Sequence, residues 1–203
     1  MIVTTSFITY VQLLDDVQKQ SFAQKYWPAL IPAVILALAI EIVILCCHSV
    51  ARKVPVNFIL LAIFTLSFSF FIGFITLPYS AAEVIQAGGA TAITTVALTI
   101  YAMTTKHDYT YCGALPWIFT SAFLSIILVF SLLTPASVAA PFFIGLIVIV
   151  YGFFLVHDTQ LIAGKSEHSH HKLGLDDYII GALIIYLDII VLFIRLLAIL
   201  GRK

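Results

Sequence analysis

Residues 178–200 read YIIGALIIYLDIIVLFIRLLAIL, an apolar stretch in which Asp188 and Arg195 are the charged residues. A helix that crosses the roughly 30 Å hydrocarbon core of a bilayer needs about 20 mostly apolar residues. In a bilayer the backbone must also satisfy its own hydrogen bonds, which a helix does internally. The stretch is therefore predicted to be a membrane-spanning helix.

The same pattern recurs along the chain. Comparable apolar runs occupy 28–47, 58–77, 84–103 and 115–133, and a run at 141–161 reaches spanning length if its helix continues to Leu161. Residues 1–14 are apolar but too short to cross alone, so they are expected to form a partial span. The predicted fold class is all-α, a polytopic membrane helical bundle forming one transmembrane domain over residues 1–203.

The composition excludes most other classes of protein. Of the 203 residues, 62% are hydrophobic and 10% are charged, whereas about a quarter of a soluble domain is charged. The formal net charge is zero, so no basic excess points to nucleic acid. The first expected partner is the lipid bilayer itself.

Lysine and arginine gather in alternate connectors, which predicts the orientation of the bundle. The connectors expected on one side carry Arg52, Lys53, Lys106, Lys165 and Lys172. Those expected on the other side carry Lys19 and Lys25. The richer side is predicted to face the cytosol, together with the N-terminus.

Charged side chains inside apolar runs are the best candidates for function. By insertion scales each costs about 2.5 to 3.5 kcal/mol at the centre of a membrane. Four such residues lie in or at the edge of the runs: Glu41, Asp158, Asp188 and Arg195. Asp188 lies near mid-membrane. It is either a functional carboxylate or one that a neighbouring hydroxyl or arginine satisfies.

Asp158 and Asp188 lie on successive spans that are expected to be antiparallel neighbours, so their carboxyl groups are predicted to face each other. Equal depth requires the earlier helix to continue past Gln160, although Gly164 favours an earlier stop. Two adjacent carboxyl groups at low dielectric tend to share a proton. When ionised, they offer the hard oxygen ligands that calcium prefers. The pattern is typical of a pH-gated cation path, with Asp158 and Asp188 as candidate calcium ligands.

Three further charges have two readings each. Arg52, at the predicted cytosolic end of a span, is either a latch that pins Asp158 or a positively charged membrane anchor. Arg195, two turns beyond Asp188, is either its partner or a side chain that extends to the interface. Glu41 is a possible supporting residue, or is satisfied by a local hydrogen bond. His168, His170 and His171 are interpreted as a solvated tract.

Several short motifs resemble a known family. They are HDTQL at 157–161, DDYIIGAL at 176–183 and YLDII at 186–190, with ARKVPVN at 51–57 and TKHDYT at 105–110 upstream. Together they resemble the transmembrane Bax-inhibitor-motif family, specifically its lifeguard branch, from about residue 27 to the end. The resemblance implies a seven-helix fold with the last helix central in the bundle.

The resemblance also implies a function. It implies a pH-sensitive calcium leak controlled by two acidic residues in the last two helices, which correspond to Asp158 and Asp188, with a latch arginine that corresponds to Arg52. Such proteins restrain cell death in the endoplasmic reticulum, the Golgi or related membranes, and the plasma membrane is a further possibility. Their partners include calcium and apoptosis-related membrane proteins. Members carry a polar tail and a complete first helix. This chain is therefore expected to start upstream or to be a truncated or isoform product.

Two other functions remain open from the residues. The first is a non-conducting interaction protein that regulates apoptotic signalling partners, in which case neutral substitutions at the aspartates leave activity intact. The second is an intramembrane aspartyl protease, but its Gly-x-Gly-Asp pattern does not match residues 174–177. We expect no enzymatic activity, and no cofactor other than calcium as the transported or regulatory ion.

Overall fold

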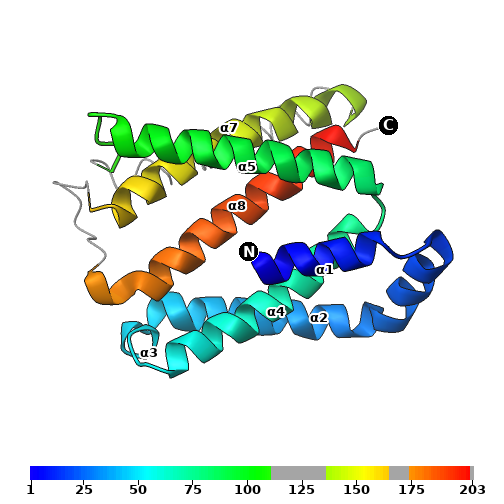
Figure 1. The fold of residues 1–203 in the computed structure, drawn as a ribbon, viewed down its shortest axis with the longest axis horizontal. Helices are drawn as coiled ribbons and strands as arrows, with labels where there is room; N and C mark the ends of the chain where they lie inside the picture. The colour runs from blue at the N-terminus through cyan, green and yellow to red at the C-terminus, as the bar shows by residue number, and fades with distance from the viewer. Residues whose placement is uncertain (111–135, 165–173, 202–203) are drawn as a thin grey trace. The chain divides into compact units, whose positions relative to one another are not determined.

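The computed structural model describes residues 1–110, 136–164 and 174–201, and the regular structure in these ranges is helical (Figure 1). The helices are α1 (Ile2–Gln12), α2 (Asp16–Cys46), α3 (His48–Ala51), α4 (Val56–Thr76), α5 (Ala81–Thr104), α7 (Ala136–Ile162), the 3₁₀ helix η1 (Leu175–Asp177) and α8 (Tyr178–Leu200). The predicted all-helical class is confirmed. The predicted span at 115–133 lies outside the described residues.

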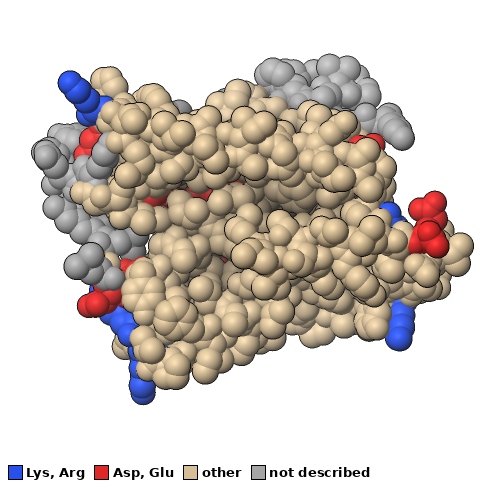
Figure 2. Space-filling view, in the orientation of Figure 1, with Lys and Arg blue, Asp and Glu red and all other residues tan. Residues whose placement is uncertain are grey.

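Five described helices are long and apolar enough to cross a membrane: α2, α4, α5, the Gly145–Ile162 part of α7, and α8. Large aliphatic side chains on their surfaces are exposed, among them Ile35 and Ile42 on α2 and Ile85 and Ile93 on α5. On the face shown in Figure 2, the visible Lys and Arg side chains lie at helix ends, and most of the surface between them is uncharged. Exposed apolar surface of this extent is what a lipid-facing bundle requires.

The start of α2 differs from the expectation. Residues 15–26, expected as a polar connector, are helical from Asp16 onward. The side chain of Gln18 accepts a hydrogen bond from the backbone N–H of Asp15 at 3.2 Å, which satisfies one free donor at the helix start. A hydropathy profile marks only the apolar part of a helix, so it did not indicate the polar first turns of α2. Pro28 and Pro32 both lie inside α2.

The chain forms two compact units, of which the first comprises Met1–Val84 and Gly174–Leu183. In this unit α4 packs against both α1 and α2. The hydroxyl groups of Thr4 and Ser69 hydrogen-bond across the α1–α4 contact at 2.9 Å. Gly73 allows this close approach, because a Cβ atom there would overlap the ring of Phe7.

The second unit comprises Ile85–Leu173 and Ile184–Lys203. Its described core includes Ala102, Leu155, Leu192 and Leu197, all of them buried. A Cβ atom added to Gly152 on α7 would lie 3.3 Å from Leu98 on α5, so these two helices pack closely. The first turns of α8, as far as Leu183, belong to the first unit, and the helix from Ile184 onward belongs to the second.

Candidate functional site

The structure brings Asp158 and Asp188 together. Asp158 lies in the last turns of α7, and Asp188 lies in the middle of α8. Their side chains hydrogen-bond to each other. Such a bond between two carboxyl groups requires a proton on one of them. Helix α7 continues past Gln160 to Ile162, as the sequence required for the two aspartates to meet, and gives way at Gly164, where φ is +69°.

One carboxyl oxygen of Asp188 is an unusual feature. Asp188 is buried, and its Oδ2 atom has no hydrogen-bond partner within the described ranges. A buried polar atom without a partner normally costs free energy.

His157 is a third titratable group at this site. Its Nδ1 lies 2.7 Å from Oδ1 of Asp158, and its ring is buried. Sequence reasoning quoted His157 as part of a motif and assigned it no role. The signal available was its position directly before Asp158 in the chain. Asp158 therefore has polar contacts with both His157 and Asp188.

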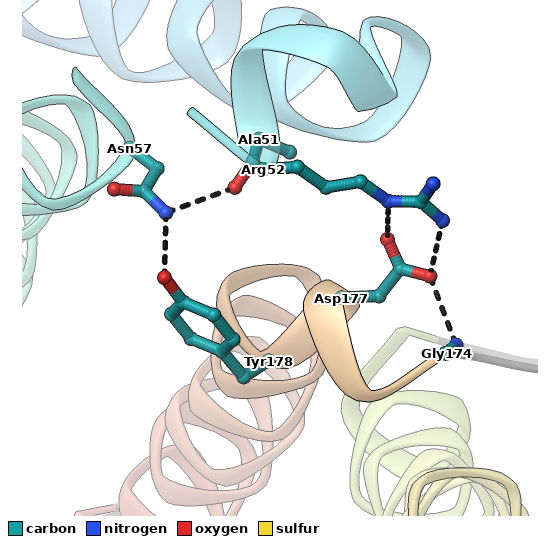
Figure 3. A network of polar contacts seen from close by, with 6 residues as sticks. All are labelled: Ala51, Arg52, Asn57, Gly174, Asp177 and Tyr178. Carbon is teal, nitrogen blue, oxygen red and sulfur yellow. Dashed lines mark hydrogen bonds and ion pairs between the residues drawn. The ribbon is translucent and has the colours of Figure 1, made fainter. Parts of the chain in front are cut away.

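Arg52 forms its ion pair with Asp177 (Figure 3). Its Nε donates to Oδ1 at 2.7 Å and its Nη2 donates to Oδ2 at 2.8 Å. This fork geometry is among the strongest side-chain pairings. The hydrogen bond from Arg52 is the main reason why the pKa of Asp177 is lowered to about 2, and the N–H of Gly174 and the charge of His48 also lower it, against the effect of burial.

The partner that the structure gives to Arg52 is Asp177. The sequence left two readings of Arg52, a latch on Asp158 or a positively charged membrane anchor, and treated Asp177 as an ordinary connector residue. In the structure Asp177 closes η1, directly before α8, and its side chain is only 4% exposed. A buried carboxylate at a helix start needs a charged partner more than a carboxylate in solvent does.

The two supporting candidates have no comparable contacts. Glu41, half-buried on α2, makes no hydrogen bond or ion pair to any other residue in the described part of the chain. Arg195 forms no ion pair with Asp188, and its buried Nε has no hydrogen-bond partner among the residues that the structure describes. The tract that contains His168, His170 and His171 lies outside the residues that the structure describes.

Gln160 is a positioning residue that sequence reasoning missed. Its side chain is fully buried. The amide oxygen accepts from the N–H of Tyr109 at 2.9 Å, and the amide nitrogen donates to the carbonyls of His107 at 2.9 Å and Ala102 at 3.3 Å. One side chain thus fastens the connector after α5 to the end of α7, next to the acidic pair.

No group of three or more His, Cys, Asp or Glu side chains within the described ranges is arranged to hold a metal ion. Asp158 and Asp188 supply carboxylate oxygens, and His157 is not a ligand that calcium prefers. Two carboxylates are a sparse set for calcium, which takes six to eight oxygen ligands.

Comparison with known proteins identifies the family of this chain. The model of the family described as "Inhibitor of apoptosis-promoting Bax1" matches residues 1–203. The chain belongs to this family. The expected resemblance to a Bax-inhibitor-motif family is therefore confirmed.

Similar members of this Bax-inhibitor family include lifeguard proteins of animals and plants. The chain is 34% identical to protein lifeguard 3 of Mus musculus over 164 residues, which are 78% of this chain and 51% of that protein. It is 33% identical to protein lifeguard 3 of Homo sapiens over 168 residues, 80% of this chain and 52% of that protein. Protein LIFEGUARD 1 of Arabidopsis thaliana is 37% identical over 159 residues, 74% of this chain and 63% of that protein.

The chain spans about half the length of the lifeguard 3 proteins that it matches. Together with the five apolar helices, membership of the Bax-inhibitor family makes this chain a multi-pass integral membrane protein.

Proposed function

We propose that the chain forms a pH-sensitive calcium leak in an intracellular membrane, and that Asp158 and Asp188 control it. The observation that carries the proposal is the hydrogen bond between the two carboxyl groups. This bond exists only while the pair holds a proton, so the pair's charge and its geometry change together with pH.

The physical basis is a change between two states of the acidic pair. With one shared proton, the two side chains are bonded and carry a single negative charge. Without that proton, they carry two charges that repel each other at low dielectric. The separated carboxylates then expose oxygens suited to a calcium ion. A two-state helix arrangement whose states differ in proton and calcium affinity responds to both ligands.

His157 is proposed to support the pair. Its ring contacts Asp158 at 2.7 Å and competes with Asp188 for the same carboxyl group. In the described part of the chain the acidic pair offers two carboxyl groups to calcium. So few ligands support a leak, because an ion that binds too tightly cannot leave.

The cellular role follows the family. We propose that the leak modulates calcium homeostasis and restrains cell death from the endoplasmic reticulum or the Golgi. The support is the family's description as an inhibitor of apoptosis-promoting Bax1 and the likeness to lifeguard proteins. The proposal includes no enzymatic step.

Calcium flux through the purified protein in liposomes tests the proposal. The wild type is compared with Asp158→Asn and Asp188→Asn from pH 5 to 8. Asp16→Asn is the control, because Asp16 is an exposed carboxylate in the first turn of α2. We expect pH-dependent flux in the wild type and the control. Each variant of the pair should abolish the flux or make it independent of pH.

Two outcomes would contradict the proposal. Wild-type flux profiles in both Asp158→Asn and Asp188→Asn would remove the acidic pair from the mechanism. A well-folded wild type without flux would favour the alternative, a membrane interaction protein that acts on apoptotic signalling partners.

A further inference from the structure

A second polar cluster joins the turn between α3 and α4 to the start of α8 (Figure 3). It consists of Arg52, Asn57, Asp177 and Tyr178, all of which lie in the first compact unit. Arg52 and Asn57 come from the two sides of one tight turn. Asp177 and Tyr178 are consecutive residues at the point where η1 becomes α8. The cluster therefore connects two segments that are far apart in the sequence.

Asn57 forms the neutral half of this cluster. Its side chain is fully buried. The amide nitrogen donates to the carbonyl of Ala51 at 3.1 Å and to the hydroxyl oxygen of Tyr178 at 3.0 Å. The amide oxygen accepts from the N–H of Phe58 at 2.8 Å. A buried amide with all of these bonds is held in one position.

The Arg52–Asp177 pair forms the charged half. Asp177 uses both oxygens, accepting two hydrogen bonds from Arg52 and one from the N–H of Gly174 at 2.9 Å. The side chain of Arg52 is 48% exposed and that of Asp177 is 4% exposed. A substitution of Arg52 would therefore leave a buried carboxylate without its main partner, which is the costly way to break such a pair.

The charged half does not titrate in the range where the leak is proposed to respond. The pKa of Asp177 is about 2 and that of Arg52 is raised further above its usual value by its bond to Asp177. The other charged neighbours are His48, which lowers the pKa of Asp177, and Asp176, which raises that of Arg52. Between pH 5 and 8 both members of the pair stay ionised.

We infer that Arg52, Asn57, Asp177 and Tyr178 form a clamp that holds the start of α8 at every physiological pH, with Asp177 as a positioning residue for the acidic pair. Helix α8 is unbroken from Tyr178 to Leu200. Asp188 lies about 15 Å along its axis from Tyr178, at 1.5 Å per residue. A helix held at one end changes the position of its middle less freely than a helix with a loose end.

This inference rests on the proposed function and assigns different tasks to the acidic pair and to the clamp. Asp158 and Asp188 sense pH, whereas the clamp fixes the helix that carries one of them. Release of the clamp should change the amount of calcium flux while the flux still varies with pH. Neutral substitution in the acidic pair should remove the variation itself.

The test combines hydrogen exchange with calcium flux. The variants are Asp177→Asn, Arg52→Gln and the charge exchange Arg52→Asp with Asp177→Arg. The matched controls are Asp176→Asn and Lys53→Gln, which change exposed charges next to the clamp. Each single variant should raise the exchange rate of the backbone amides in the first turns of α8 by about tenfold, the scale expected for the loss of a charged hydrogen bond. The charge exchange should restore most of the protection, and the controls should match the wild type.

In liposomes from pH 5 to 8, the single variants should change the flux severalfold and keep its pH dependence, and the charge exchange should recover wild-type flux. If Asp177→Asn does not fold, Tyr178→Phe removes the bond to Asn57 and tests the same clamp. Wild-type exchange at the start of α8 in the folded single variants would overturn the inference. So would a flux that loses its pH dependence in Asp177→Asn. Because exchange is measured without flux, the clamp can be supported even if the acidic pair proves not to control a leak.

Discussion

The side chain of Gln160 accepts a hydrogen bond from the backbone N–H of Tyr109 at 2.9 Å, joining positions 51 residues apart in the sequence. The same amide group donates to the carbonyls of Ala102 and His107. The last carbonyls of a helix have no partner within that helix. Gln160 on α7 therefore caps the end of α5 and orders the connector that follows it.

Replacement of Gln160 by leucine should destabilise the second unit. The substitution removes the side-chain hydrogen bonds of one N–H and two carbonyl groups, and a buried polar group that loses its partner costs about 1 to 3 kcal/mol. Thermal unfolding in detergent should show a lower midpoint, and the amide of Tyr109 should exchange faster. Gln86→Leu on the exposed surface of α5 is the control. Equal midpoints for Gln160→Leu and the wild type would show that these three bonds contribute nothing to stability.

Replacement of Gly73 by alanine should loosen the contact between α1 and α4. The new Cβ atom would overlap the ring of Phe7, and overpacking of this kind costs about 1 to 3 kcal/mol. The control is Gly89→Ala on α5, where the added atom meets nothing within 4 Å and alanine should stabilise the helix. The double variant Gly73→Ala with Phe7→Leu should recover part of the lost unfolding midpoint. No recovery would mean that the overlap with Phe7 is not the cause.

Acid should remove the stabilisation from the Arg52–Asp177 pair. The pKa of Asp177 is lowered from 3.8 to about 2 in the folded chain, so the folded state binds its proton less readily than the unfolded state. The stabilisation is therefore complete above about pH 4 and is lost as the pH falls towards 2. The difference in unfolding midpoint between wild type and Asp177→Asn should be constant from pH 5 to 7 and shrink below pH 4. A difference that changes between pH 5 and 7 would contradict this assignment.

The spans and the proximity of the two aspartates could be predicted from the sequence. Hydropathy locates a helix that must enter lipid, and a short connector makes successive spans antiparallel neighbours, so Asp158 and Asp188 were expected to face each other. Both inferences use only local pattern and the thickness of a bilayer.

The partner of Arg52 and the role of Gln160 could not be predicted from the sequence. Hydropathy classes Asp177 with the solvated connector, because burial of a polar connector residue depends on tertiary contacts that a local pattern does not contain. Gln160 bonds to backbone groups. Every residue has these groups, so the sequence does not mark which of them are the partners of Gln160. His157 was visible beside Asp158, but an imidazole at a helix end is equally compatible with solvent. These contacts depend on where segments distant in the chain meet.

The two prolines of α2 have a consequence for the membrane around the protein. At 31 residues, α2 is about 46 Å long, against a hydrocarbon core of about 30 Å. Pro28 and Pro32 each lack a backbone N–H, so the carbonyls of Gln24 and Pro28 lose their usual helical partners. These gaps follow the first turns of α2, which carry the charged residues Asp16, Lys19 and Lys25. A helix bends most easily where such bonds are missing. By changing its tilt at this point, α2 can match bilayers of different thickness.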